Sequence, residues 1–188
     1  RLNEDDPDVW RLRHRLARRA NDQQAMLKAL RAYCRLRPDD EPAQLQLILN
    51  EIDQDRSTQT LDARILAAEE ILNRENGLSN AVRSRLASYI AIRARQFGDQ
   101  VRLRRYLKLA IKLDAANLEA AQLTVELVKE FDASLGHKGL ALIGLVKASP
   151  FDPVVRRELA DVLLALNAYE TAAEQYDCLL YTSDAADD

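Results

Sequence analysis

Apolar residues recur along the chain at the three- and four-residue spacing of amphipathic helices, and short polar breaks separate the runs. The pattern is clearest between residues 151 and 177, where Asp152 followed by Pro153 is typical of a helix start. The first stripe consists of Val155, Leu159, Val162, Leu163 and Leu166, and the second, after a break at 167–168, of Tyr169, Ala172, Ala173 and Tyr176. Two short amphipathic helices joined by almost no loop are expected to pack as an antiparallel hairpin.

The same pattern repeats through the rest of the chain. Asp6 followed by Pro7 predicts the start of a first helix, whose expected apolar face is Val9, Leu12, Leu16 and Ala20. The second helix should bury Met26, Leu27, Leu30, Tyr33 and Cys34, and the fourth Leu61, Ile65, Ala68 and Leu72. Later helices should bury Leu86, Ile90, Phe97, Leu103 and Tyr106.

Turn residues divide this pattern into about ten helices. Ser79 is expected to cap the fifth helix, Asn76 and Gly77 to end the fourth, and Gly98 and Asp99 to form a turn. Breaks between hairpins fall near Pro38, Asn76, Asp114 and Pro150, a spacing of roughly 35–38 residues that is typical of stacked helical repeats. The predicted fold class is therefore all-α, an α-solenoid of about five antiparallel helix hairpins.

Composition supports a helical protein and excludes a membrane span within the sequence. Only 5 Gly and 5 Pro occur in 188 residues, of which 47% are hydrophobic and 30% charged. The longest apolar run, at 139–146, is far shorter than the ~18 residues that a membrane helix needs.

The last residues have an unusual sequence. CLLYTSDAAD at 178–187 resembles the translation of a transposase-derived sequencing adapter, so we interpret 178–188 as a non-native tail. On this interpretation residues 1–177 form one helical-repeat domain, a fragment of a larger bacterial protein truncated at both ends. The tail holds three of the 30 acidic residues, so residues 1–177 carry 27 basic and 27 acidic residues and no net charge.

The last hairpin resembles a tetratricopeptide repeat, a motif of two helices with small residues where the helices touch. Leu159, Ala160, Ala172 and Tyr176 stand at the family's spacings. In the unit around residues 80–114, the matching positions are Ala91, Ala110, the Gly98–Asp99 turn and Leu113–Asp114.

The resemblance is weaker toward the N-terminus. Trp10 and Pro38 match the family's aromatic and proline positions in the first unit, but His14 stands where a small residue belongs. Residues 41–78 match poorly. The resemblance implies a solenoid of helix pairs that binds proteins or peptides in its concave groove and is not an enzyme.

Arginines provide the sharpest candidate site. Arg11, Arg15 and Arg18 recur at i, i+4 and i+7, and the family's register places them on the groove side of the first helix. The equivalent positions are Arg85, Ser88, Ile92, Arg95 and Gln96 in the third unit and Glu119, Gln122, Glu126, Lys129 and Glu130 in the fourth. We therefore expect Arg11, Arg15, Arg18, Arg85 and Arg95 to contact a peptide rich in carboxylates, which arginine binds in a bidentate fork.

Two other interpretations of these arginines remain. They can form a solvated helix face that covers apolar surface and pairs with neighbouring acids. They can also bind nucleic acid, but the neutral charge and the lack of interleaved aromatics argue against this. The Lys and Asn pattern of the family's carboxylate clamp is absent from these positions, so that specific clamp is not expected.

The remaining reactive residue types favour structural roles. His14 and His137 lack metal-ligand spacing, and Cys34 lies on an apolar helix face that suggests packing. Gly139 lies on an apolar seam and suggests a close helix approach rather than a phosphate loop. Glu69 and Glu70 are expected to be ordinary surface charges. No catalytic residue, metal or cofactor is predicted.

The function predicted from the sequence is a protein- or peptide-binding scaffold. One alternative is the regulatory or substrate-positioning arm of an enzyme whose catalytic domain lies outside this sequence. Another is an assembly factor whose membrane anchor lies upstream. Neither nucleic acid nor a membrane segment within these residues is part of the prediction.

Overall fold

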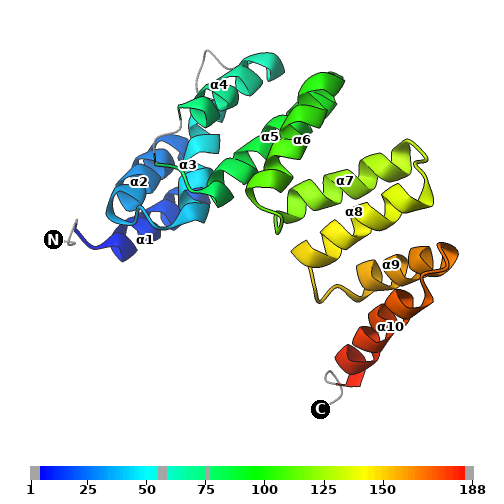
Figure 1. Ribbon diagram of the computed structural model, residues 1–188. Coiled ribbons are helices and arrows are strands. Elements are labelled where there is room, and N and C mark those ends of the chain that lie inside the picture. The colour runs from blue at the N-terminus through cyan, green and yellow to red at the C-terminus, as the bar shows by residue number, and fades with distance from the viewer. Residues whose placement is uncertain (1–4, 55–58, 75–76, 185–188) are drawn as a thin grey trace. The chain divides into compact units, whose positions relative to one another are not determined.

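The computed structural model describes residues 5–54, 59–74 and 77–184, and the regular structure of these residues is entirely α-helical (Figure 1). The ten helices are α1 (Pro7–Arg19), α2 (Gln23–Leu36), α3 (Glu41–Gln54), α4 (Leu61–Asn73), α5 (Asn80–Phe97), α6 (Gln100–Leu113), α7 (Leu118–Glu130), α8 (Leu135–Ala148), α9 (Pro153–Ala165) and α10 (Tyr169–Asp184). The number and order of helices confirm the all-α prediction.

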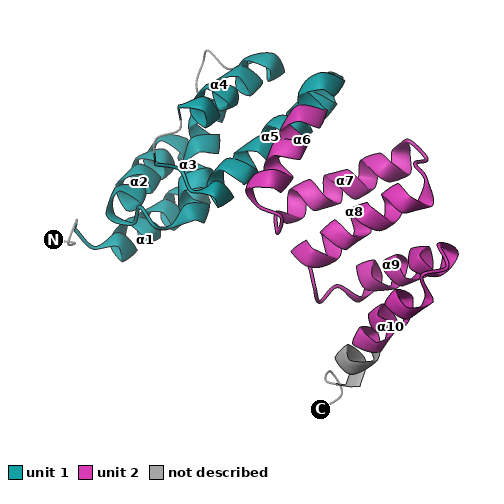
Figure 2. Ribbon diagram, viewed as in Figure 1, with its two compact units in different colours: residues 1–103 teal, residues 104–188 magenta. Residues whose placement is uncertain are grey.

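The chain divides into two compact units, residues 1–103 and 104–188, with the boundary inside α6 (Figure 2). In the first unit α1 packs on α2, α2 on α3, and α5 on both α3 and α4. In the second unit α7 packs on α8, α8 on α9, and α9 on α10. Helices therefore pack mainly against their neighbours in sequence, as in a helical-repeat array.

Helix starts follow the capping rules that the sequence suggested. Asp6 Oδ1 accepts a 2.9 Å hydrogen bond from Asp8 N at the start of α1, and Asp152 Oδ1 accepts one of 3.0 Å from Val154 N at the start of α9. The Ser79 hydroxyl oxygen accepts a 3.2 Å hydrogen bond from Val82 N and caps α5, as predicted. Each cap satisfies a backbone N–H that has no partner within the helix.

One turn geometry recurs where α1, α5, α7 and α9 end. Asn21, Gly98, Asp132 and Asn167 have positive φ angles of 54°, 81°, 44° and 61°. The residue after each donates to a carbonyl five residues back, as in Asp22 N to Ala17 O at 2.9 Å and Asp99 N to Ala94 O at 2.8 Å. These bonds define the Schellman motif, in which a left-handed residue stops the helix and reverses the chain.

Each unit has its own apolar core. In the first unit Trp10, Ala29, Leu30, Tyr33 and Ala43 join α1, α2 and α3. In the second, Ala121, Val125, Ala141, Leu142, Leu145, Leu159, Leu163 and Ala172 join α7 to α10. The predicted burial of Ile65, Ala68 and Leu72 on α4 is confirmed.

Several predicted core positions are wrong. On α1 the buried residues are Trp10 and Ala17, whereas Leu12 and Leu16 are 46% and 54% exposed. Helix α1 packs on α2 through its Trp10 side, and the described residues leave the Leu12 and Leu16 side uncovered. Phe97, at the end of α5, and Tyr169, at the start of α10, are also exposed, at 56% and 64%.

The predicted tight approach at Gly139 is confirmed. A methyl group on Gly139 would lie 3.6 Å from both Leu166 Cδ1 and Val162 Cγ1, so α8 and α9 are in van der Waals contact there. Asn76, expected to end α4 with Gly77, lies outside the described residues. Gly77 itself has a φ of 94°, which suits glycine.

Candidate functional site

The side chains on different sides of helix α1 differ in burial and charge. Trp10 and Ala17 are buried, whereas Arg11, Arg15 and Arg18 are exposed. Because successive residues of an α-helix are rotated by about 100°, these three arginines share one side of α1. That side is the candidate ligand surface, here named the arginine face.

A pocket of about 210 Å³ begins beside Arg11 and lies between α1, α2 and α3. Its described lining consists of Arg11, His14, Leu30, Tyr33, Asp40, Pro42, Ala43 and Gln46. The lining thus combines a guanidinium, an imidazole, a phenol, a carboxylate and an amide. Arg15 and Arg18 do not line it and lie further along the exposed side of α1.

A short polar connection holds one wall of this pocket. The Tyr33 hydroxyl donates a 2.7 Å hydrogen bond to Asp40 Oδ2, and Asp40 Oδ1 accepts one of 3.0 Å from Ala43 N. These two hydrogen bonds, with smaller contributions from the charges of Arg11 and Arg37, lower the pKa of Asp40. The same bond to Asp40 raises the pKa of Tyr33, so at neutral pH the pair is a phenol and a carboxylate.

His14 occupies the position where the tetratricopeptide pattern has a small residue. Partial burial, followed by the charge of Arg18, lowers the pKa of His14, so its imidazole is neutral at pH 7. Its Nε2 is buried and has no hydrogen-bond partner among the described residues. His14 is therefore a neutral polar group beside the pocket and adds no charge to the arginine face.

The arginines predicted on α5 are less uniform. Arg85 is exposed, whereas Arg95 is half-buried and has interactions of its own. Ser88, which the register placed on the groove side, is 0% exposed. This register-based expectation for Ser88 is wrong because α5 packs against both α3 and α4 and buries more than one of its sides. Arg85 and Arg95 do not line the pocket beside Arg11.

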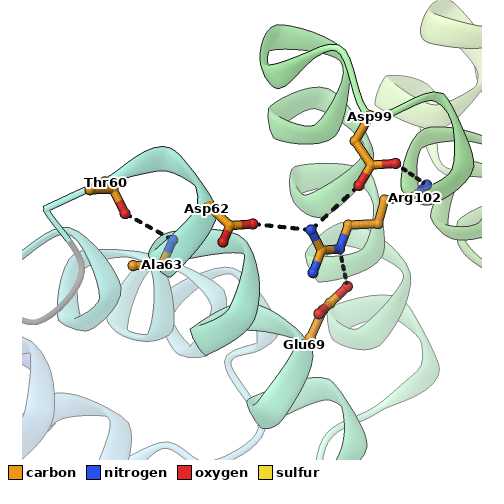
Figure 3. A network of polar contacts seen from close by, with 6 residues as sticks. All are labelled: Thr60, Asp62, Ala63, Glu69, Asp99 and Arg102. Atoms are coloured by element: carbon orange, nitrogen blue, oxygen red, sulfur yellow. Dashed lines mark hydrogen bonds and ion pairs between the residues drawn. The ribbon is translucent and has the colours of Figure 1, made fainter.

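An ion-pair cluster around Arg102 was not foreseen (Figure 3). Arg102 Nε lies 3.1 Å from Glu69 Oε1, and Arg102 Nη1 lies 3.0 Å from Asp62 Oδ1 and 3.4 Å from Asp99 Oδ2. Glu69, expected to be a plain surface charge, has a side chain that is only 16% exposed. The cluster joins the first turn of α6 to α4 and has a structural role.

The pocket residues were also missed as a group. Tyr33 was predicted as core and the region near Pro38 as a break between hairpins, and both predictions are correct in themselves. Gln46 had no sequence signal at all. The pocket depends on three helices meeting, and no spacing along the chain indicates such a meeting.

Two further properties concern metals and membranes. The described residues contain no group of three or more His, Cys, Asp or Glu side chains that could hold a metal ion. No described helix combines the length and the apolar surface that a bilayer crossing requires. Cys34 packs against the core of Trp10, Leu30 and Tyr33, and burial raises the pKa of its thiol to about 11.

No protein-family model matches the chain, and no curated protein matches it significantly. Among solved structures, the "Crystal structure of MamA protein" aligns over 95% of this chain and 92% of its own, with 10% identity and a TM-score of 0.51. "MamA RS-1 ArsTM double mutant" aligns over 96% of both chains, with 13% identity and a TM-score of 0.49. "MamA 41-end from Desulfovibrio magneticus RS-1" aligns over 97% of both, with 16% identity and a TM-score of 0.47.

The first of these similarities shows the fold. With the recurring hairpins and turns, it establishes that the chain has a tetratricopeptide-like α-solenoid fold. At 10% identity it says nothing about ligand or partner.

Proposed function

We propose that this chain is a scaffold that binds a protein or peptide through the arginine face of α1. The observation that carries the proposal is the exposure of Arg11, Arg15 and Arg18 on one side of α1, beside the pocket that Arg11 lines. Helical-repeat folds offer extended surfaces of this kind, on which side chains from successive helices contact one ligand.

The chemistry of the face favours an acidic ligand. Arginine binds carboxylates through two parallel N–H···O bonds and loses less hydration than lysine when it does so. The rise of an α-helix places Arg11 and Arg18 about 10 Å apart along the axis. An extended peptide covers that distance in about three residues, so the preferred ligand has two or three carboxylates within four or five residues.

The pocket lies at one end of the arginine face and so fixes the direction in which a peptide ligand runs. Arg11 contributes to both the pocket and the arginine face, and the carboxylate of Asp40 in the pocket disfavours a second negative charge there. The ligand segment that enters the pocket is therefore polar and uncharged, able to bond to Gln46 and the neutral His14. Carboxylates that follow it along the peptide lie over Arg15 and Arg18.

Arg85 and Arg95 would extend the contact only if the ligand continues from α1 to α5. Since Arg95 is half-buried and engaged, Arg85 is the better candidate of the two. Assembly of partner proteins is the outcome expected of such a scaffold.

A titration with a fluorescently labelled acidic peptide tests the proposal. Arg15→Glu and Arg18→Glu should each weaken binding by about tenfold or more, because each replaces attraction by repulsion. Arg104→Glu, at an exposed arginine of α6 outside the face, is the matched control and should bind like the parent. Raising the salt concentration should also weaken binding by the parent. Unchanged binding in both α1 variants would show that the arginine face is not the site.

A further inference from the structure

A second hollow lies between α1 and α2, on the side of α1 away from Arg11. It consists of two adjoining depressions of about 520 and 440 Å³ that share Trp10 and Lys28, here named the Trp10 groove. Each depression has the size of a typical ligand or peptide pocket. On α1 the groove extends from Trp10 to Ala20, a rise of about 15 Å, which equals nearly three turns of a helix.

The groove has an apolar base. Its apolar side chains in the larger depression are Trp10, Leu16, Ala17, Ala20, Ala25 and Ala29. Four of these are alanines, whose small side chains allow another helix to approach closely. Leu16 is a large apolar residue that stays more than half exposed here, on the side of α1 that the sequence pattern predicted to be core.

The edges of the groove are basic. Arg13, Lys28, Arg31 and Arg35 line them. The Arg13 guanidinium lies 4.4 Å from the centre of the Trp10 ring, and Arg31 Nε lies 2.8 Å from Glu51 Oε1, which offsets the Arg31 charge. Asp22 is the acidic residue of the described lining, and its Oδ1 accepts a hydrogen bond from Ala25 N. Positive charge therefore exceeds negative charge along the groove.

From this combination we infer that the Trp10 groove docks an amphipathic α-helix of a partner protein, with an apolar stripe flanked by acidic side chains. A helix suits the groove because it satisfies its own backbone hydrogen bonds, and the backbone groups of α1 and α2 are already used within those helices. An extended peptide would find no backbone partners on this base. The acidic flanks of the docked helix face Lys28 and Arg35, and its apolar stripe covers Leu16 and the alanines.

The groove and the arginine face are separate surfaces. Helical rotation places Leu16 and Ala20 about half a turn from Arg11, so one ligand helix cannot cover both. Binding at the groove can therefore be tested independently of the function proposed above.

The chain carries its own reporter for this interaction. Trp10 is the sole tryptophan in the sequence, and it lines both depressions. A synthetic helical peptide of about 18 residues, with a leucine and alanine stripe flanked by glutamates, is the probe. Its addition to the 188-residue chain should change the tryptophan emission in a saturable way. A matched peptide with lysine at every glutamate should bind at least tenfold more weakly.

Substitutions identify the surface. Lys28 and Arg35 are both exposed. Lys28→Glu and Arg35→Glu should each weaken binding of the glutamate peptide by about fivefold or more. The far-ultraviolet circular dichroism of both variants should match that of the parent. Arg104→Glu, at an exposed arginine of α6 that belongs to neither surface, should leave this binding unchanged. The inference is overturned if the tryptophan emission shows no saturable change, if the two peptides bind equally, or if the Lys28 and Arg104 variants lose equal amounts of binding. Sedimentation that shows a second copy of the chain occupying the groove, with dimerisation lost in Lys28→Glu, also overturns it.

Discussion

The hydroxyl of Tyr33 on α2 donates a 2.7 Å hydrogen bond to Asp40 Oδ2, just before α3 begins. This bond fixes the passage from the first hairpin to the second, because Asp40 also caps the backbone at Ala43. The connection is therefore important both for stability and for one wall of the pocket beside Arg11.

Removal of the Tyr33 hydroxyl should destabilise the chain. Tyr33→Phe loses a hydrogen bond to a charged acceptor, which typically lowers the free energy of unfolding by about 1–3 kcal/mol. Urea unfolding at pH 7 measures the change. Tyr169→Phe is the control, because the Tyr169 hydroxyl bonds Asn167 on the exposed surface and its loss should cost less than about 0.5 kcal/mol. Equal losses in both variants would contradict the role assigned to Tyr33.

The same pair predicts how stability depends on pH. The folded-state pKa of Asp40 is below its ordinary 3.8, so its contribution is present above that value and disappears as pH falls through the lowered pKa. The folded-state pKa of Tyr33 is above 10.0, so its contribution is present below pH 10 and disappears as pH rises toward the raised pKa. Tyr33→Phe should flatten both ends of a stability profile measured from pH 2.5 to 11.

The Arg102 cluster should contribute more than a surface ion pair. Arg102→Ala leaves Asp62, Glu69 and Asp99 close together without their common cation and should lower the free energy of unfolding by about 1–3 kcal/mol. Arg74→Ala removes an exposed ion pair with Glu70 and should change the free energy of unfolding by less than about 0.5 kcal/mol. Chemical denaturation of both variants measures the difference. A small change in the free energy of unfolding of Arg102→Ala would mean that water solvates the three carboxylates as well as Arg102 stabilises them.

Gly139 should accept one methyl group and nothing larger. Gly139→Ala places its methyl at ordinary contact distance from α9 and should raise stability by up to about 1 kcal/mol through better helix propensity. Gly139→Leu forces α8 from α9 and should cost about 1–3 kcal/mol. Gly144→Leu is the control, since no atom lies within 4 Å of its added Cβ. Thermal unfolding distinguishes these cases, and a tolerated leucine at 139 would contradict the close packing.

The two cysteines should differ in reactivity. Because the pKa of the Cys34 thiol is raised to about 11, only about one molecule in a thousand carries the thiolate at pH 8. Cys178 is exposed on α10. Iodoacetamide at pH 8 should therefore label Cys178 first, and Cys34 only after unfolding. Mass spectrometry of the labelled chain locates the adducts, and rapid labelling in a Cys178→Ser variant would refute the prediction.

Local features of the fold were predictable from the sequence, and neighbour-dependent features were not. Helix starts at Asp6, Ser79 and Asp152 depend on a few adjacent residues, so their sequence signals were sufficient. The buried side of α1 depends on where α2 lies, and periodicity alone favoured Leu12 and Leu16 over Trp10.

The candidate site shows the same division. Arg11, Arg15 and Arg18 could be assigned to one helix side from their spacing, because helical rotation is fixed. The pocket beside Arg11 needed the positions of α2 and α3, and the partnership of Glu69 with Arg102 joins residues 33 positions apart. Such meetings depend on tertiary packing, which leaves no short-range pattern in a single sequence.

The recurring Schellman turns at Asn21, Gly98, Asp132 and Asn167 have a kinetic consequence. Each closes a helix with hydrogen bonds that join residues five apart or fewer, and the helices then pack mainly on sequence neighbours. The contact order of the chain is therefore low, and proteins of low contact order fold in about microseconds to milliseconds. Folding should nucleate in any single hairpin and propagate to the next, so its rate should depend little on which hairpin forms first.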